Sequence, residues 1–166
     1  MTETTSRLTL PLLASGQAQK EIWHNEALML LDGLVQPVVQ AVAPASVPSS
    51  PALGQCWIVG LAPSGDWAGH AKALACWTAG GWRFVAPFEG MQGWSIADGV
   101  PVRFEGGSWV IGQVVVSAVR IGGNQVLGAR QGAISDPTGG TVIDVESRLA
   151  LLAILGALRT HGLISP

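Results

Sequence analysis

The residues with the clearest chemical potential lie in one short glycine-rich stretch, Gly65-Asp66-Trp67-Ala68-Gly69-His70. An exposed Trp67 would offer a flat apolar ring on which a sugar could stack. Asp66 and His70 beside it could bond to the hydroxyl groups of that sugar. The two glycines let the backbone come close to a ligand, because they have no side chain in the way. This stretch therefore predicts a shallow saccharide-binding site, unless the loop folds back and buries Trp67.

A weaker set of the same kind is formed by Gln92, Trp94 and Asp98. All tryptophans except Trp23 lie between residues 57 and 109, so one segment holds nearly all of the aromatic surface. The candidate ligand-binding residues are Asp66, Trp67, His70 and Trp94.

The sequence contains no pattern typical of an enzyme, a cofactor site or a metal centre. The motifs GxSxG, HExxH and GxxxxGK[ST] are absent. The three histidines (His24, His70 and His161) are not at metal-ligand spacing to one another or to a cysteine. Two cysteines do not complete a structural zinc site by themselves. We therefore expect a non-enzymatic protein without a cofactor or a metal ion.

The composition favours an oligomer. The 166-residue chain is 48% hydrophobic but only 12% charged, whereas typical soluble domains have about 25% charged residues. Such a chain either buries more surface than a monomer can or exposes apolar patches. We expect no membrane insertion, because no apolar run reaches the roughly 18 residues of a spanning helix. A net charge of −2 without a basic patch argues against nucleic-acid binding.

Two further features bear on where the protein is made. Residues 1–7 lack the pattern of a signal peptide, so we expect synthesis in the cytosol. Cys56 and Cys76, each followed by a tryptophan, are expected to be buried free thiols, with one disulfide as the alternative.

Residues 1–40 are predicted to form an N-terminal arm and a helix. Apolar residues recur at helical spacing from Ala18 to about Gln36. Ser15 is placed to cap this helix and Pro37 to end it. Residues 41–53 contain three prolines among alanines and serines, and they predict a linker.

Residues 54–111 predict a small antiparallel, tryptophan-rich β domain. Its main support is a short repeat, in which Trp77-Thr-Ala-Gly-Gly-Trp82 is followed by Phe104-Glu-Gly-Gly-Ser-Trp109. Each copy predicts a tight hairpin, with glycines in the turn and aromatic residues paired across the strands. The predicted strands are residues 56–59, 74–77, 82–85, 102–104 and 108–111.

Residues 112–166 predict a β segment followed by a C-terminal helix. Strand character extends over 114–121 and 125–134, around a turn at residues 122–124. Asp144 is placed to cap a helix that ends near His161, and Gly162 to stop it. Apolar residues lie on more than one side of this helix, which is typical of helices that pack on copies of themselves. The predicted oligomerisation residues are Val145, Leu149, Leu152, Leu155 and Leu158.

These elements predict an α+β chain: an N-terminal helix, a small antiparallel tryptophan-rich β domain, a β segment and a C-terminal helix. Leucine and isoleucine at both core positions of the C-terminal helix disfavour a two-stranded coil. We therefore expect a homotrimer with these helices bundled in parallel.

Several short motifs together indicate a family resemblance. Those near the N-terminus are Leu10-Pro11-Leu12-Leu13, Gly16-Gln17-Ala18-Gln19-Lys20, His24-Asn25-Glu26-Ala27-Leu28 and Leu31-Asp32. Those in the middle are Trp67-Ala68-Gly69-His70, Ala75-Cys76-Trp77, Gly81-Trp82-Arg83-Phe84 and Ala86-Pro87. With these motifs the chain resembles, from about residue 8 to 164, a domain family, formerly of unknown function, in fibre and spike proteins of alphaproteobacterial phages and gene transfer agents.

The resemblance implies a structural and host-attachment component, either tail fibre or head spike, of a phage-like particle. The implied partners are other copies of this chain, other particle proteins and bacterial surface polysaccharide. The protein would be assembled in the bacterial cytoplasm and reside in the virion or virus-like particle. A free-standing carbohydrate-binding module is the alternative, and native mass spectrometry would separate the two.

Overall fold

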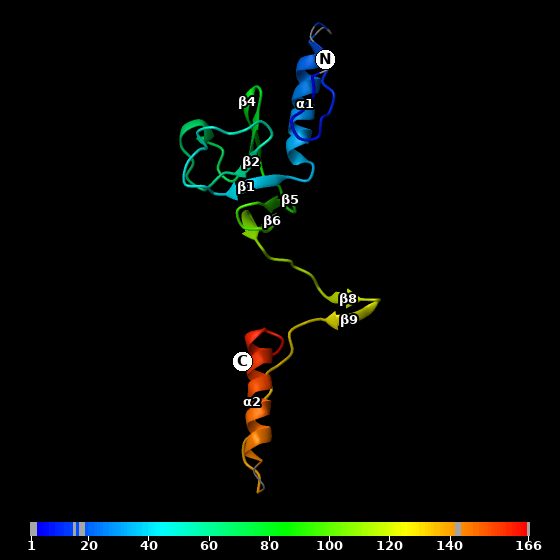
Figure 1. Cartoon of the computed structure of the whole chain (residues 1–166), viewed down its shortest axis with the longest axis vertical. Helices are drawn as coiled ribbons and strands as arrows, with labels where there is room; N and C mark the ends of the chain where they lie inside the picture. Colours follow the sequence, from blue (N-terminus) through cyan, green and yellow to red (C-terminus); the bar gives the residue numbers. More distant parts are fainter. Residues whose placement is uncertain (1–2, 15, 17–18, 142–143, 166) are drawn as a thin grey trace. The chain divides into compact units, whose positions relative to one another are not determined.

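The computed structural model describes residues 3–14, 16, 19–141 and 144–165. The chain divides into two compact units, residues 1–113 (unit 1) and residues 114–166 (unit 2), and each is considered by itself (Figure 1). In the described part of the chain, two α-helices and a mostly antiparallel β-sheet confirm the predicted α+β class. Among the described residues, no helix is both long enough and apolar enough to cross a lipid bilayer.

Unit 1 is built on a seven-stranded sheet with the order β4-β3-β2-β1-β5-β6-β7. The first antiparallel meander comprises β2 (Cys56–Ile58), β3 (Leu74–Thr78) and β4 (Gly81–Val85). The second comprises β5 (Gln92–Ser95), β6 (Val100–Glu105) and β7 (Ser108–Ile111). Strand β1 (Val38–Val42) lies between them and pairs in parallel with both β2 and β5.

Both predicted glycine hairpins are confirmed. Trp77 lies opposite Trp82 and Phe104 lies opposite Trp109, with ring centroids 5.0 and 5.5 Å apart. In the second hairpin Gly106 and Gly107 both have positive φ, 56° and 77°, as a two-residue type I′ turn requires. In the first hairpin the positive φ of 93° belongs to Gly81, which starts the returning strand.

Two apolar clusters stabilise unit 1. The first cluster lies between the meanders and consists of Val39, Cys56, Ile58, Leu74, Cys76, Met91, Val102 and Phe104. The second cluster covers the other face of the first meander and consists of Trp57, Val59, Trp67 and Ala75, with Trp82 and Phe84 packed against it. The first meander is therefore covered on both faces, whereas the second contributes to one cluster only.

The expectation of free thiols is wrong. Cys56 and Cys76 are directly opposite each other on β2 and β3, and they form a disulfide within the first cluster. Residues directly opposite each other on antiparallel strands have Cβ atoms close enough for a disulfide to form. The sequence alone did not predict that these two strands are neighbours.

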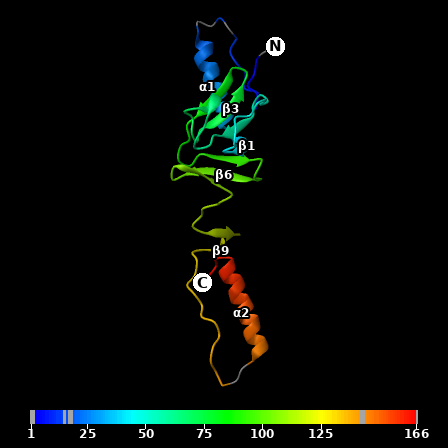
Figure 2. The same cartoon turned by 90° about the vertical axis from the view of Figure 1, so that its left-hand side faces the viewer.

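Helix α1 (Lys20–Leu34) confirms the predicted N-terminal helix and runs beside the sheet (Figure 2). The predicted cap, Ser15, lies outside the described residues. The boundary at residue 41 is wrong, because Ala41 and Val42 belong to the central strand β1. Residues 43–55 do connect two strands, β1 and β2, but within one compact unit.

Unit 2 contains a hairpin and a helix. Strands β8 (Val119–Ile121) and β9 (Asn124–Leu127) are joined by a turn at Gly122-Gly123. Both strands are shorter than the sequence predicts. Helix α2 (Val145–Thr160) begins and ends as predicted, with Asp144 as its N-cap and a positive φ of 70° at Gly162. A hydrogen bond from the backbone N–H of Ser147 to the Asp144 carboxylate, with a second from the Ser147 hydroxyl, lowers the pKa of that carboxyl group.

Unit 2 leaves most of its apolar surface uncovered. Of the five predicted oligomerisation residues only Leu155 is buried, Leu158 is half-buried, and Leu149 is 61% exposed. Residues 149–158 contain no polar side chain, so α2 is apolar all round over this stretch. The valines at 114–116 are exposed as well.

Candidate functional site

The predicted saccharide loop is a structural element of the core. Residues Gly65–Trp67 form a short 3-10 helix that turns the indole of Trp67 inward, where only 3% of its surface is exposed. Its ring lies 5.3 Å from that of Trp82 and 6.4 Å from that of Trp57, centroid to centroid. The prediction that Trp67 offers a stacking face is therefore wrong, and the alternative of a loop folded back onto the sheet is correct.

The other predicted residues of this loop do not form a site with Trp67. His70 is exposed on one side, but its ring stacks on Phe84 with 3.7 Å between centroids and 5° between planes. Asp66 is exposed at the surface. Trp94 lies on β5, in the other meander, and shares no described pocket with these residues.

Trp94 instead lies in a groove with Gln92, another member of the weaker predicted set, and with Gln36, which the sequence did not indicate. The groove has a volume of about 360 Å³ and is open to solvent, between the end of α1 and the start of β5. Its lining is Leu34, residues 36–38 and residues 92–94. Trp94 is 47% exposed, and the side chains of Gln36 and Gln92 are exposed beside it. We call this the Trp94 groove.

Strand pairing places these residues together. Val38 is the register partner of Trp94, and the N–H of Trp94 donates to the carbonyl of Pro37 at 2.9 Å. Because side chains alternate along β5, Ser95 is fully buried while Trp94 faces outward. Asp98, the third member of the weaker predicted set, instead accepts a hydrogen bond from Ser95 Oγ in the turn that follows β5.

The backbone at the groove is held in place by the N-terminal arm. Gln36 has φ of 50°, in the left-handed region that non-glycine residues rarely adopt. Its carbonyl accepts a hydrogen bond of 2.8 Å from Arg7 Nη2, and the Arg7 guanidinium also reaches the carbonyl of Asp32 near the end of α1. The strained residue is thus fixed by contacts from outside the helix, as such conformations require.

Asp32 is the anchor of that arm. The residue is 5% exposed, and its carboxylate accepts hydrogen bonds from Thr5 Oγ1 (2.7 Å), the N–H of Arg7 (3.0 Å) and the N–H of Leu8 (2.7 Å). Asn25, earlier on α1, binds another part of the N-terminal arm in a similar way. Its carboxamide accepts a hydrogen bond from the N–H of Leu13 and donates one to the carbonyl of Leu13. Motif residues on which the family resemblance was based therefore have a structural role.

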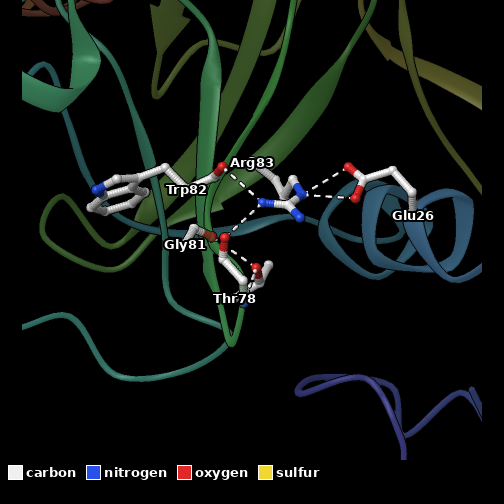
Figure 3. A network of polar contacts seen from close by, with 6 residues as sticks. Glu26, Thr78, Gly81, Trp82 and Arg83 are labelled. Carbon is white, nitrogen blue, oxygen red and sulfur yellow. Dashed lines mark hydrogen bonds and ion pairs between the residues drawn. The ribbon is translucent and has the colours of Figure 1, made fainter. Parts of the chain in front are cut away.

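A third motif residue joins the helix to the sheet. Glu26 of α1 forms an ion pair of 2.8 Å with Nε of Arg83 on β4, and Arg83 also donates to the carbonyl of Trp82 (Figure 3). In the same view Thr78 Oγ1 donates to the carbonyl of Gly81 at the first glycine hairpin. These contacts fix α1 against the first meander, and so fix the groove at the end of α1.

The chemistry of the Trp94 groove is that of a binding site. Its lining combines one aromatic ring with two carboxamides and has no acid, base or nucleophile. In the portion of the chain that the structure describes, no cluster of histidine, cysteine, aspartate and glutamate could hold a metal ion. Sequence reasoning identified Trp94 but missed Gln36. The residues just before Pro37 contain no motif typical of a binding site.

Unit 1 is a small α+β domain in which one helix lies beside a sheet made of two meanders and a central strand. The chain belongs to the family described as "Protein of unknown function (DUF2793)", whose model matches residues 24–110, more than half of the chain and nearly all of the seven-stranded sheet. No curated protein matches the sequence.

Proposed function

We propose that this protein is a structural and host-attachment component, a tail fibre or head spike, of a phage-like particle or gene transfer agent. In this proposal it assembles with other copies of itself and with other particle proteins, and it contacts polysaccharide on the bacterial surface. Its location is the virion or virus-like particle, assembled in the bacterial cytoplasm.

The observation that carries the structural half of the proposal is the uncovered apolar surface of unit 2. A helix that is apolar on all sides is stable in water only when other chains or domains cover it. Leu149, Leu151 and Ile154 are each about half exposed or more, and together they cover more than one side of α2. A fibre or spike provides the missing cover by placing copies of the same helix around a common axis.

Three copies fit this helix better than two. A two-stranded coiled coil buries one narrow stripe, whereas bundles of higher order bury a wider face. Charged residues of α2 are confined to its ends, where Arg148 and Arg159 donate to carbonyl groups of the preceding segment. The central residues 149–158 have no charge that would oppose self-association.

The test is the mass of the purified chain in solution. We expect light scattering and native mass spectrometry at micromolar concentration to give three times the 17.2 kDa of one chain. Leu149→Glu is expected to dissociate the trimer, because it places a charge on the apolar bundle face. Leu61→Glu, at an exposed leucine of unit 1, is the matched control and should leave the mass unchanged. A monomeric wild-type chain would contradict the proposal.

The particle role has its own test. Antibodies against unit 1 should label purified particles at the tail tip or the head surface in negative-stain electron microscopy. If the chain forms a trimer in solution but the antibodies label neither site, the protein self-assembles outside any particle. That result would contradict the attachment role.

A free-standing carbohydrate-binding module is the second candidate. It is favoured by one observation, the open Trp94 groove on a unit that has its own two apolar clusters. A monomer that binds saccharide would support this candidate over the particle component.

A further inference from the structure

We infer that the Trp94 groove is the attachment site and that it binds one ring of a neutral saccharide. This inference rests on the proposed attachment function and moves its contact surface from the buried Trp67 loop to the second meander. The half-exposed Trp94 ring supplies the flat apolar face that the Trp67 loop does not.

The polar groups of the groove suit hydroxyl ligands. A carboxamide has an acceptor oxygen and two donor hydrogens, and a sugar hydroxyl both donates and accepts. Within the part of the chain that the structure describes, neither the Gln36 nor the Gln92 side chain has a hydrogen-bond partner. Two such groups beside an aromatic ring can therefore orient a ring that stacks on Trp94.

The absence of charge in the lining selects a neutral ligand. No residue that lines the groove is acidic or basic. The cations that adjoin the lining are Arg7, whose guanidinium donates to the backbone carbonyls of Asp32 and Gln36, and Arg103, the register partner of Gln92, which is paired with Glu105 on its own strand. Both guanidinium groups are bound by protein oxygens and no lining residue is charged, so the lining suits a neutral ring better than a phosphate or carboxylate.

The groove is formed before any ligand arrives. Arg7 holds the left-handed backbone at Gln36, and Asp32 holds the chain around Arg7. Gly93 has no room for a side chain, because a Cβ there would lie 2.8 Å from the carbonyl oxygen of Pro37. This close approach brings β5 against the end of α1. Preorganisation of this kind reduces the loss of conformational entropy on binding.

The size of the groove also suits a single ring. Its volume of about 360 Å³ is near the lower end of small-molecule sites. An open groove with a few contacts binds weakly on its own. In the proposed trimer, three copies would raise the avidity for a repeating polymer by orders of magnitude without new contacts.

The experiment uses the full chain on a printed panel of purified bacterial capsular and O-chain polysaccharides, with each spot duplicated after periodate oxidation. We expect wild-type protein to bind at least one neutral polysaccharide and to lose binding after oxidation. Trp94→Ala should weaken that binding at least tenfold, and Gln92→Ala several-fold. Trp23→Ala is the matched control, because Trp23 is 80% exposed on α1 but does not line the groove.

The outcomes separate the groove from the attachment function. If wild type binds and both Trp94→Ala and Gln92→Ala bind equally well, the groove inference is overturned and saccharide attachment stands. If wild type binds no polysaccharide, the attachment proposal itself is overturned. Binding confined to anionic polymers and abolished by about 0.5 M salt contradicts the neutral ligand. Circular dichroism of each variant shows whether a loss reflects unfolding, and the exposed Gln92 keeps the test decisive if Trp94→Ala unfolds.

Discussion

The two meanders of unit 1 share the same aromatic and glycine hairpin but differ in what covers their outer faces. In the first meander, the connection from β2 to β3 extends over residues 59–73 and returns Trp67 to the sheet beside Trp57 and Trp82. In the second, only residues 96–99 connect β5 to β6, so no segment of this connection folds over Trp94.

Loop length therefore separates a core tryptophan from a surface tryptophan. Both residues lie in a polar and glycine-containing neighbourhood, so local composition does not distinguish them. A connection of four residues is only long enough to reverse the chain direction. A connection of fifteen residues is long enough to place an aromatic ring against the face of the sheet. The short loop leaves one face of the second meander free for a ligand.

The largest expected difference is between the two tryptophans. Trp67→Ala should lower the free energy of unfolding by about 3–5 kcal/mol, because it removes a fully enclosed ring and leaves a cavity. Trp94→Ala should lower it by less than about 1 kcal/mol, because half of that ring already contacts water. Urea unfolding followed by far-ultraviolet circular dichroism measures both. Equal losses would mean that the two faces are covered alike.

An intermediate difference is expected between the two glycine hairpins. Gly107→Ala should cost about 1–2 kcal/mol, because its φ of 77° is unfavourable for a residue with a Cβ. Gly80→Ala should cost less, about 0.5–1 kcal/mol. Gly80 has no positive φ, but its new Cβ would lie 3.0 Å from the Arg83 guanidinium, which is held by Glu26 and would have to shift slightly. Thermal unfolding of the two variants tests the assignment, and similar shifts would show that both turns have the same geometry.

The smallest difference is expected between two ion pairs. Glu26→Gln breaks a pair that joins α1 to β4, and it should cost about 0.5–1 kcal/mol. Glu105→Gln breaks a pair within one strand of the second meander, and the cost should be about 0–0.5 kcal/mol. Both losses should shrink in high salt, since both pairs are partly exposed. A larger effect at Glu105 would show that the open face depends on its charges.

Local pattern was sufficient for much of this fold. The glycine pairs before Trp82 and Trp109 predicted both hairpins. A tight turn needs positive φ close to its centre, and the glycines that allow it are adjacent in the sequence. Asp144 and Gly162 predicted the ends of α2, because capping also acts over three or four residues. The central strand β1 was missed, because residues 38–40 were assigned to the N-terminal arm and helix and residues 41–42 to the proline-rich linker.

The candidate site depended on contacts that are distant in sequence. The amino-acid sequence by itself determined the helices, the hairpins and the apolar character of α2, since these follow from the spacing of neighbouring side chains. Only the tertiary structure decided that Cys56 meets Cys76, that Arg7 holds Gln36, and that Trp67 is enclosed while Trp94 is open. Burial and strand pairing bring together residues that are tens of positions apart in the sequence. The energy of such contacts depends on the packing of the whole sheet, so no short stretch of sequence predicts it.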